Sequence, residues 1–516
     1  MNKPHSNHIS IPGEIRTFFG KPGGRSLLVK GGAGSGKTTM ALQLLEDLAD
    51  PLKSIYLSSR VSDEALFRQF PWLEKEEMKN RIIDASRVLL KHLVPDEDDV
   101  DDVPDAEHHE RLSSARDFLR SVSDEPLAPP SKVDRTRLTV LLERNRMPEI
   151  ERIYDRVEAN LPEKSMIIID SVEGITNKYS LENEELVTCI QKDLVEGSNV
   201  DVVFILENKE ATNLEYLVDG VVKHTYESRE GRRVRNIHIE KLRGTKILQP
   251  SYLVTLNDGR FNTFDPFKMY LGDIAQWEPI PDHNRLYSTG TRDLDVLLDG
   301  GFKAGSYNVI EVDENVSNED YHSIVVPILL NFIALEKGVF AVLSGGDHAE
   351  TLKKDLDKFL PKGQFENYVR IADYFTNKSD SPYIMALGGR VTKEEKEKAV
   401  QTWNSNVAFL RGPDNKPIMD FTGFDTLEYL RGGEVAIQHL LDAVAKIKIS
   451  NDLGIGILKP GLRLTQEIMN MADTYLKIIT IDKCPCIYGV KPKTMIYGIV
   501  NDLERGTPNI QLIPII

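Results

Sequence analysis

The chain is poor in cysteine: its 516 residues include only Cys189, Cys484 and Cys486. So few cysteines exclude a disulfide-stabilised scaffold and fit a reducing compartment. The segment Cys484-Pro-Cys486 is too short for a CxxC redox pair, and no second pair completes a zinc site. We therefore expect Cys484 and Cys486 to have a structural role.

Long apolar runs are also missing from the sequence. No stretch reaches the ~18 apolar residues of a membrane span, and the best candidate, residues 324–335, contains Pro327 and Asn331. We expect that segment to be a core helix. The first residues lack the apolar centre of a signal peptide, so the sequence predicts a cytoplasmic protein without a membrane segment.

An excess of basic residues is the third absence. The formal net charge is −16, so long-range attraction to DNA or to an anionic membrane is not expected. Hydrophobic residues make up 41% of the chain, which is enough to bury a core. The length favours two or three domains over one.

One segment carries a specific motif for phosphate binding. Residues 31–38, GGAGSGKT, match G-x4-G-K-[ST] at each fixed position, between a predicted strand at 27–29 and an apolar-periodic helix. Glycines at these positions let backbone N–H groups turn toward a β-phosphate, and the helix N-terminus adds positive potential. The residues that we expect to contact nucleotide are Gly31, Gly32, Ala33, Gly34, Ser35, Gly36, Lys37, Thr38 and Thr39.

A distant acid completes a predicted magnesium site. Lys37 suits the β/γ oxygens of a triphosphate, and the Thr38 hydroxyl suits Mg²⁺. Residues 165–171, SMIIIDS, read as a parallel strand covered on both faces. Asp170 is then expected at the carboxyl end of that strand, beside the phosphates, where it would hold Mg²⁺ together with Thr38.

Three segments resemble RecA-superfamily ATPases of the KaiC/GvpD type, with the GvpD-like archaeal regulators as the most similar branch. They are GGAGSGKTTMALQLL, IIIDSVEGI and the block at 216–244. The resemblance implies that the nucleotide is ATP or ADP. It also implies that Lys241-Leu242-Arg243 is a Lys-x-Arg element that reaches the γ-phosphate held by a neighbouring subunit. Lys37, Lys241 and Arg243 would then be the catalytic cations of a homo-oligomer.

Without the resemblance, the block at 216–244 and its surroundings form a basic strip that fits several roles. It could be a solvated face, an anion site or a nucleic-acid patch, although the acidic chain as a whole makes nucleic acid an unexpected partner. The members of the strip are Arg229, Arg232, Arg233, Arg235, Lys241, Arg243 and Lys246.

The chain departs from the resembled ATPases after the second predicted strand. Those ATPases usually carry a Glu-Glu pair there that orients the attacking water, whereas Arg60 and Val61 occupy the positions here. Neither side chain accepts a proton from water at neutral pH. Asp63, Glu64 or Glu207 could substitute. We expect a slow ATPase, or a protein that holds ATP as a state signal.

The second half repeats the frame of the first without its phosphate-binding residues. Aligning Gly305 with Gly24 places Val312, Ser317, Asn318 and Glu319 at the fixed loop positions. The nearby acids would repel a triphosphate. Lys491-Pro-Lys493 falls where Lys241-Leu-Arg243 does, and Asp420 is a weak counterpart of Asp170. An internal repeat of about 240 residues fits this order, and a shorter, unrelated α/β domain is the alternative.

The predicted fold is therefore α/β, with two RecA-like P-loop NTPase domains that each have a mostly parallel twisted sheet flanked by helices. The second lacks a functional P-loop. We expect an ATP-binding domain at 1–264 with an acidic loop at 95–110, a linker at 265–287 and a degenerate domain at 288–516. His108 and His109 in that loop match no defined metal site, so we assign none.

Three functions fit these observations. The first is an ATP-binding regulatory protein that contacts a protein partner through its degenerate second domain. The second is a DNA recombination or repair accessory ATPase, supported only by the basic strip. The third is an ATP-stabilised scaffold that does not hydrolyse ATP.

Overall fold

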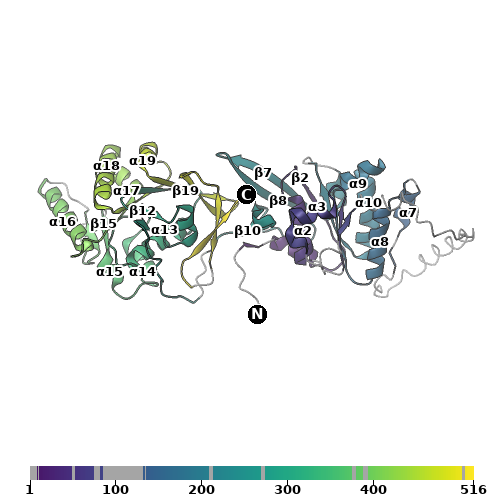
Figure 1. Cartoon of the computed structure of the whole chain (residues 1–516), viewed down its shortest axis with the longest axis horizontal. Helices are drawn as coiled ribbons and strands as arrows, with labels where there is room; N and C mark the ends of the chain where they lie inside the picture. Colours follow the sequence, from purple (N-terminus) through teal and green to yellow (C-terminus); the bar gives the residue numbers. More distant parts are fainter. Residues whose placement is uncertain are drawn as a thin grey trace, which may run out of the picture.

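The computed structural model describes residues 8–9, 11–48, 53–74, 82–84, 132–133, 135–143, 145–208, 213–268, 273–374, 379–387, 393–502 and 506–516. The acidic tract at 95–110, with its two histidines, lies outside these residues. The described chain forms two lobes that lie end to end (Figure 1).

The first lobe is built on a ten-stranded mixed sheet. In sheet order its strands are β1 (His8–Ile9), β10 (Asn262–Phe264), β9 (Ser251–Thr255), β8 (Arg232–Leu242), β7 (Gly220–Arg229), β2 (Ser26–Gly31), β6 (Asp201–Leu206), β5 (Met166–Asp170), β3 (Ser54–Ser58) and β4 (Ile82–Asp84). Pairing is parallel from β7 to β4 and antiparallel from β7 to β1. The sheet therefore has a parallel part and an antiparallel part.

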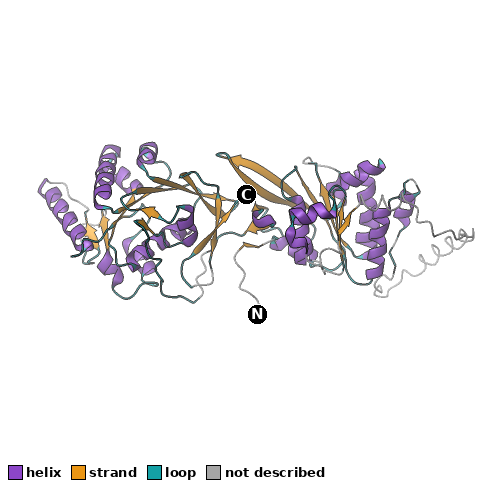
Figure 2. Ribbon diagram, viewed as in Figure 1, coloured by secondary structure: helices purple, strands orange, loops and turns teal. Residues whose placement is uncertain are grey.

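Helices cover both faces of the parallel part of this sheet (Figure 2). They are α1 (Gly13–Phe19), α2 (Lys37–Leu48), α3 (Asp63–Gln69), α7 (Thr136–Leu142), α8 (Pro148–Asn160), α9 (Val172–Tyr179), α10 (Asn183–Ile190) and α11 (Leu214–Leu217), with short turns η1 (Pro71–Glu74), η2 (Gln191–Glu196) and η3 (Asn257–Gly259). One core cluster joins α1 and α2 to the sheet, and another joins α8, α9 and α10 to it.

The strands and helices predicted for the first lobe are explained by a sheet that is buried on both of its faces. Each residue of β2 and β6 is buried, which explains their continuous apolar runs. The predicted helix at 147–160 corresponds to α8, which buries Ile150, Ile153, Tyr154 and Val157 against the sheet. Because the strand before the motif and the helix after it are both present, the phosphate-binding segment has the context that the motif requires.

The second lobe has a second ten-stranded mixed sheet. In sheet order its strands are β16 (Ile384–Ala386), β15 (Val369–Asp373), β14 (Val339–Val342), β17 (Met419–Gly423), β18 (Leu453–Leu458), β13 (Tyr307–Val312), β19 (Thr474–Ile481), β20 (Cys484–Lys491), β21 (Tyr497–Asn501) and β22 (Ile510–Pro514). Its helices are α12 (Arg292–Leu297), α13 (Asn318–Ala334), α14 (Ala349–Leu356), α15 (Gln364–Tyr368), α16 (Lys393–Arg411), α17 (Phe424–Arg431), α18 (Gly433–Ser450) and α19 (Thr465–Met471). A separate two-stranded sheet, β11 (Leu286–Tyr287) with β12 (Phe302–Lys303), precedes β13.

The two large sheets share one strand order, which confirms the internal repeat. The second lobe has one extra edge strand, β16. If β16 is left out and strands are counted along the chain from β2 or from β13, both sheets run 3-2-4-5-1-6-7. Side-chain contacts repeat as well. Asp219 accepts the N–H of Ser26 at 3.2 Å, and Asp473 accepts the N–H of Tyr307 at 3.0 Å. Ser26 and Tyr307 each follow the aligned glycines, Gly24 and Gly305, by two residues, so the two contacts agree with that alignment.

The interpretation of Asp420 as a counterpart of Asp170 is wrong. Asp170 is the last residue of β5, at the carboxyl edge of the sheet, whereas Asp420 is the second residue of β17, near the amino end. Gly423 pairs with Ile457, and Ile457 pairs with the residue of β13 that is equivalent to the β2 residue at the level of Asp170. Gly423, and not Asp420, therefore occupies the position of Asp170 in the second sheet. Strand register cannot be read from the sequence, and an acid within a predicted strand does not show at which end of that strand it lies.

The two lobes meet through the antiparallel parts of their sheets. A buried cluster joins Val234, Leu253 and Phe264 of the first sheet to Ile481 and Tyr488 of the second. Cys484 and Cys486 are buried in the same cluster as free thiols, and burial raises the pKa of Cys484. This placement fits the structural role that we expect for them.

Polar contacts fix the same junction. The Arg232 guanidinium donates from Nε to Thr494 O at 2.7 Å and from Nη2 to Gly489 O at 2.8 Å, and it lies 4.4 Å from the centre of the Tyr488 ring. Thr255 Oγ1 donates to Pro514 O at 2.6 Å. Arg232 therefore connects the lobes, although the sequence placed it in a basic strip.

Residues 273–287, in the expected linker, lie against the second lobe. The indole of Trp277 is buried and donates from Nε1 to Asn331 Oδ1 at 3.4 Å, and the Trp277 N–H donates to Phe359 O at 2.9 Å. Asn331 belongs to α13, the core helix expected at 324–335.

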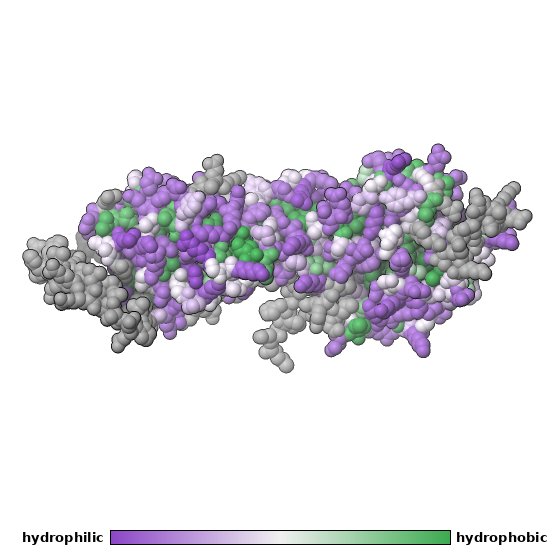
Figure 3. Space-filling view, turned by 180° about the vertical axis from the view of Figure 1, so that it is seen from behind, coloured by the Kyte–Doolittle hydropathy of each residue, from purple (hydrophilic) through white to green (hydrophobic). Residues whose placement is uncertain are grey.

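Within the described residues, no helix is long and apolar enough to cross a membrane. On the face shown in Figure 3, apolar residues form small groups among hydrophilic ones.

Candidate functional site

The GGAGSGKT segment forms a loop between the carboxyl end of β2 and the first residue of α2. Gly31 has a φ of +155°, and a Cβ there would lie 2.7 Å from the carbonyl oxygen of His224. Gly36 has a φ of +94°, and its Cβ would lie 3.0 Å from the Leu256 side chain. Both positions favour glycine because their positive φ is unfavourable for other residues, and at Gly31 a Cβ would also meet backbone.

The N-terminus of α2 is suited to an anion. Its first turn contains no acidic residue and begins with Lys37, Thr38 and Thr39. A helix N-terminus carries unpaired N–H groups and a positive partial charge, so a phosphate placed there is stabilised.

The corresponding helix of the second lobe, α13, is occupied by its own side chains. Ser317 Oγ accepts the N–H of Asp320 at 3.1 Å, and the Asp320 carboxylate accepts the N–H of Ser317 at 3.3 Å. Glu319 adds a second acid to the first turn. These groups satisfy the helix end and repel a further anion. The second lobe therefore keeps the strand and helix but not the phosphate cradle.

Lys37 is folded back onto the loop. Its Nζ donates to Gly31 O at 2.8 Å and to Gly32 O at 2.9 Å, and the residue is only 8% exposed. Burial lowers the pKa of Lys37, and the carboxylates of Asp170, Glu207 and Glu173 oppose that shift. A phosphate oxygen would give this desolvated ammonium a charged acceptor in place of neutral carbonyls.

Thr38 and Asp170, which are far apart in the sequence, are brought together. Thr38 Oγ1 donates to Asp170 Oδ2 at 2.7 Å. Tyr56 Oη donates to the same oxygen at 2.5 Å from the neighbouring strand β3. Burial raises the pKa of Asp170, whereas these two hydrogen bonds and Lys37 lower it. A hydroxyl and a carboxylate at this separation are ligands that suit Mg²⁺ in a P-loop.

Three acids lie near the Lys37 ammonium, and two of them were not assigned a role from the motif. Glu207 follows β6 and pairs with Arg60 at 2.5 Å. Glu173 lies in the first turn of α9, where its Oε1 accepts the N–H of Glu207 at 2.7 Å. Glu173 Oε2 is buried and has no hydrogen-bond partner among the described residues. Arg60 therefore holds Glu207 at the edge of the site.

The other candidate substitutes for the missing glutamate pair lie on α3. Asp63 and Glu64 are in its first turn, and Asp63 Oδ1 accepts the N–H of Glu64 at 2.9 Å. Val61 packs against the core cluster of α1 and α2. Glu207, one of the three acids considered from the sequence, is among the carboxylates whose charge raises the pKa of Lys37 against the effect of burial.

The strand β7 contributes a buried histidine to the loop. His224 pairs with Gly31 in the sheet, and its Nδ1 lies 3.1 Å from Ser35 O. Burial, with a smaller contribution from the charge of Lys37, lowers the pKa of His224 to about 4. The ring is therefore neutral at neutral pH, with its Nδ1–H donating to the loop.

We expect this histidine to make the stability of the first lobe depend on pH. In the unfolded chain the ring protonates near pH 6.5, whereas in the folded state it does so near pH 4. Between these values the unfolded state binds more protons, so the free energy of unfolding decreases as the pH falls from 6.5 to 4, by roughly 3 kcal/mol. Urea denaturation at pH 7.0 and 4.5 measures this loss. The His224→Gln variant should lose less between the two pH values, and an equal loss in both proteins would contradict this assignment.

Arg235 on β8 adds a cation beside the loop. Its Nε donates to Gly34 O at 3.2 Å, and the residue is 9% exposed. In the described part of the chain no carboxylate forms an ion pair with it, and burial lowers its pKa. Nothing in the motif indicates this contact, because the hairpin that carries Arg235 is 200 residues away in sequence.

Lys241 and Arg243 lie toward the opposite end of the sheet from the loop of their own chain. Lys241 pairs with Val221, which pairs with Leu28, so it is about 10 Å along the strand from Gly31. Its Nζ donates to Glu215 O at 2.8 Å and to Val218 O at 2.6 Å. Arg243 is exposed and lies 3.4 Å from Asp219. Neither side chain approaches the phosphate loop of this chain.

The lysine contact is repeated in the second lobe. Lys491 Nζ donates to Met469 O at 2.7 Å and to Ala472 O at 3.5 Å, at the end of α19. This lobe lacks the phosphate-binding residues of the motif, so the contact does not depend on them. We conclude that the carbonyl contacts of Lys241 are a feature of the fold. The Arg243 side chain is exposed, and it donates to Asp219 and to Tyr216 O.

The basic strip does not form one surface. Arg232 is buried between the lobes, Arg235 faces the phosphate loop, and Arg229 pairs with Glu227 at 2.5 Å. A nucleic-acid patch requires several cations on one accessible face. The strip therefore gives little support to a nucleic-acid interface.

Comparison with known proteins adds a family to this geometry. A model described as "GvpD gas vesicle protein, P-loop domain" matches residues 15–240, and one described as "GvpD basic region 2" matches residues 276–516. Two proteins of Halobacterium salinarum are similar over nearly their whole length. Protein GvpD2 is 27% identical over 519 residues, with 98% of this chain and 97% of the relative covered. Protein GvpD1 is 23% identical over 563 residues, with 98% and 96% covered.

Proposed function

The chain belongs to the GvpD family, and we propose that it is a gas vesicle regulatory protein that binds Mg-ATP in its first lobe. The observation that carries this proposal is the loop at the start of α2. Its helix end is free of acids, Lys37 is desolvated within it, and Thr38 and Asp170 lie together beside it. In the second lobe the same helix end is capped by Ser317 and Asp320, so we propose one nucleotide per chain.

Different residues of the first lobe would bind the phosphates, bind Mg²⁺ and orient the attacking water. Loop N–H groups and Lys37 would hold the phosphates, with Arg235 adding positive charge from the hairpin side. Thr38 and Asp170 would hold Mg²⁺, and Tyr56 would keep the Asp170 carboxylate oriented. Glu207, held by Arg60, is our candidate for the residue that orients an attacking water.

We further propose that a neighbouring subunit supplies a residue that is needed for hydrolysis of the bound ATP. The exposed guanidinium of Arg243 lies far from its own phosphate loop and so suits a role in trans. Lys241 is held by carbonyls in its own chain, so we assign it a supporting role for the strand that carries Arg243.

Phosphate release from Mg-ATP at protein concentrations spanning about a hundredfold tests this proposal. An arginine supplied in trans contributes roughly 10³-fold or more, so Arg243→Ala should reduce release to background while the wild-type specific activity rises with concentration. Arg229→Ala, which removes another exposed arginine of the same hairpin, is the matched control and should retain activity. Glu207→Gln should also abolish release without weakening ATP binding.

The other outcomes of this experiment distinguish the alternatives. If ATP binds but no phosphate appears at any concentration, the protein holds ATP as a signal or as part of a scaffold. If the activity is independent of concentration and Arg243→Ala is fully active, the site is complete within one chain and the proposal in trans fails. Contact with a protein partner through the second lobe stays a prediction.

A further inference from the structure

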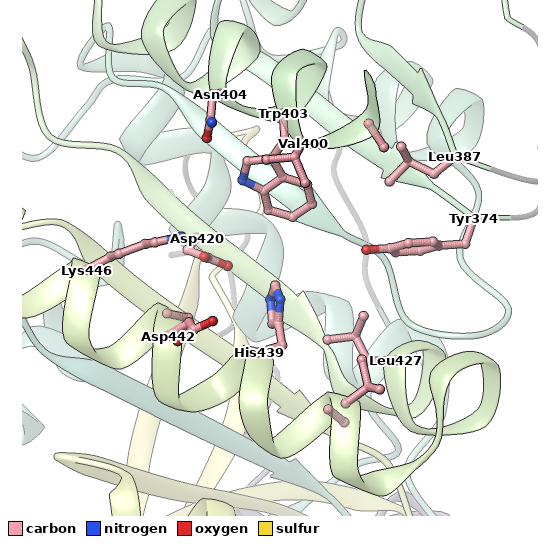
Figure 4. A pocket seen from close by; sticks show the side chains of 14 residues that line it. Tyr374, Leu387, Val400, Trp403, Asn404, Asp420, Leu427, His439, Asp442 and Lys446 are labelled. Carbon is pink, nitrogen blue, oxygen red and sulfur yellow. The ribbon is translucent and has the colours of Figure 1, made fainter. Parts of the chain in front are cut away.

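The second lobe contains a cavity that is separate from the nucleotide site. It has a volume of about 420 Å³ and lies between α16 and α18, over one face of the second sheet (Figure 4). Ligand sites for small molecules have volumes of roughly 300–1,000 Å³. The cavity is thus large enough for a small organic molecule.

One end of the cavity is apolar and aromatic. The rings of Trp403 and Tyr374 face it, together with the aliphatic side chains of Leu387 and Leu427 (Figure 4). Trp403 is held in place by Phe340, whose ring centre lies 4.1 Å away. These walls suit a compact apolar body, and the faces of aromatic rings also attract cations.

The floor and the other end of the cavity are polar. Asp420 projects from β17 toward the helices, and Thr422 Oγ1 donates to its Oδ1 at 2.8 Å. His439 extends from α18 into the cavity, and its buried Nε2 has no hydrogen-bond partner among the described residues. Polar groups in a buried place are usually paired, because each unpaired group costs free energy. The unpaired imidazole nitrogen of His439, which shares this cavity with the Asp420 carboxylate, therefore indicates a missing partner.

The charges around the cavity favour a positive ligand. Asp420 and Asp442 contribute two carboxylates, and Lys446 contributes one ammonium. Burial raises the pKa of Asp420, and the charges of His439 and Lys446 oppose that rise. Lys446 is exposed, and Figure 4 shows its side chain on the same side of the cavity as Asp420 and Asp442.

We infer that this cavity binds a small organic cation, a protonated amine on a compact apolar or aromatic body, with its nitrogen against Asp420 and its body between Trp403 and Tyr374. The ammonium would donate to the free oxygen of Asp420 and to the unpaired nitrogen of His439. This site would be independent of the first-lobe nucleotide, because the two loci are on different sheets.

Calorimetric titration with benzylamine, benzyl alcohol and benzoate tests the inference, because the three probes share a ring and differ in charge. Wild type should bind benzylamine more tightly than benzyl alcohol, and benzoate should not bind. Asp420→Asn should reduce benzylamine affinity by roughly 10–150-fold, as expected for the loss of a charge-assisted hydrogen bond. Asp414→Asn, at an exposed position in the turn after α16, is the matched control and should bind like the wild type.

A second variant keeps the test valid if Asp420→Asn fails to fold. Lys446→Gln removes an exposed competing cation and should raise benzylamine affinity about threefold or more, since Coulomb repulsion at close range is removed. Lys37→Ala should leave the affinity for benzylamine unchanged, and this result would show that the cavity is separate from the nucleotide site. Equal affinity for benzylamine and benzyl alcohol, preference for benzoate, or no binding of any probe at millimolar concentration would overturn the inference.

Discussion

Replacing Lys37 by alanine should lower the affinity for Mg-ATP by roughly 10–150-fold, because a charge-assisted contact of this kind contributes roughly 1.5–3 kcal/mol. The Lys37 ammonium is already desolvated and bonded to the carbonyls of Gly31 and Gly32, so it needs little reorganisation to reach a phosphate. Equilibrium titration of wild type and variant with a fluorescent ATP analogue in the presence of Mg²⁺ measures the change.

The repeat supplies a matched control for this variant. Asn318 takes the position of Lys37 in the second lobe, at the start of α13, so Asn318→Ala should leave the affinity for Mg-ATP unchanged. If Lys37→Ala bound Mg-ATP as tightly as the wild type, the loop at 31–38 would not be the nucleotide site.

Replacing Arg232 by alanine should destabilise the protein by roughly 2–4 kcal/mol. The variant loses two hydrogen bonds between the lobes and the contact with the Tyr488 ring, while Gly489 O keeps the hydrogen bond that it accepts from the Thr494 N–H. The Arg232 side chain is only 8% exposed, so water replaces it poorly. Urea denaturation, followed by tryptophan fluorescence, measures the loss.

Arg229 is the control for this prediction because it ends the neighbouring strand of the same hairpin. Its side chain is 45% exposed and pairs with a Glu227 side chain that is 53% exposed, so Arg229→Ala should change stability by less than about 1 kcal/mol. Similar denaturation curves for Arg232→Ala and wild type would show that the lobes are held together mainly by their apolar cluster.

The sequence predicted the parts of the site that one continuous segment specifies. The loop at 31–38, the strand before it and the helix after it are local, and each residue type has one physical reason to be there. Asp170 could also be placed, because a continuous apolar run that ends in an acid predicts a buried parallel strand with the acid at its carboxyl end. In the structure, Asp170 is the last residue of β5 and accepts a hydrogen bond from Thr38.

The missed residues are those that reach the site from distant strands. Tyr56, His224 and Arg235 are ordinary strand residues in the sequence, and their contacts depend on strand order and on the face that each side chain takes. The same limit explains the error at Asp420. Its strand could be predicted, but its level in the sheet could not, since register is set by pairing with β14 and β18.

The repeat shows which contacts belong to the fold and which to nucleotide binding. The pairs Asp219–Ser26 and Asp473–Tyr307 occur in both lobes, as do the lysine contacts of Lys241 and Lys491. Burial of the two sheets is sufficient to retain them. The loop residues differ between lobes, because a helix end without a phosphate needs side chains such as Ser317 to satisfy its N–H groups.

The most direct test of the account is the stoichiometry of Mg-ATP binding to the full chain, measured by isothermal titration calorimetry. The account predicts one nucleotide per chain for the wild type, and for Lys37→Ala an affinity that is roughly 10–150-fold weaker. Two nucleotides per chain would mean that the second lobe has kept a site despite the acids at the start of α13. No binding to the wild type would contradict the central claim that the first lobe is a nucleotide site.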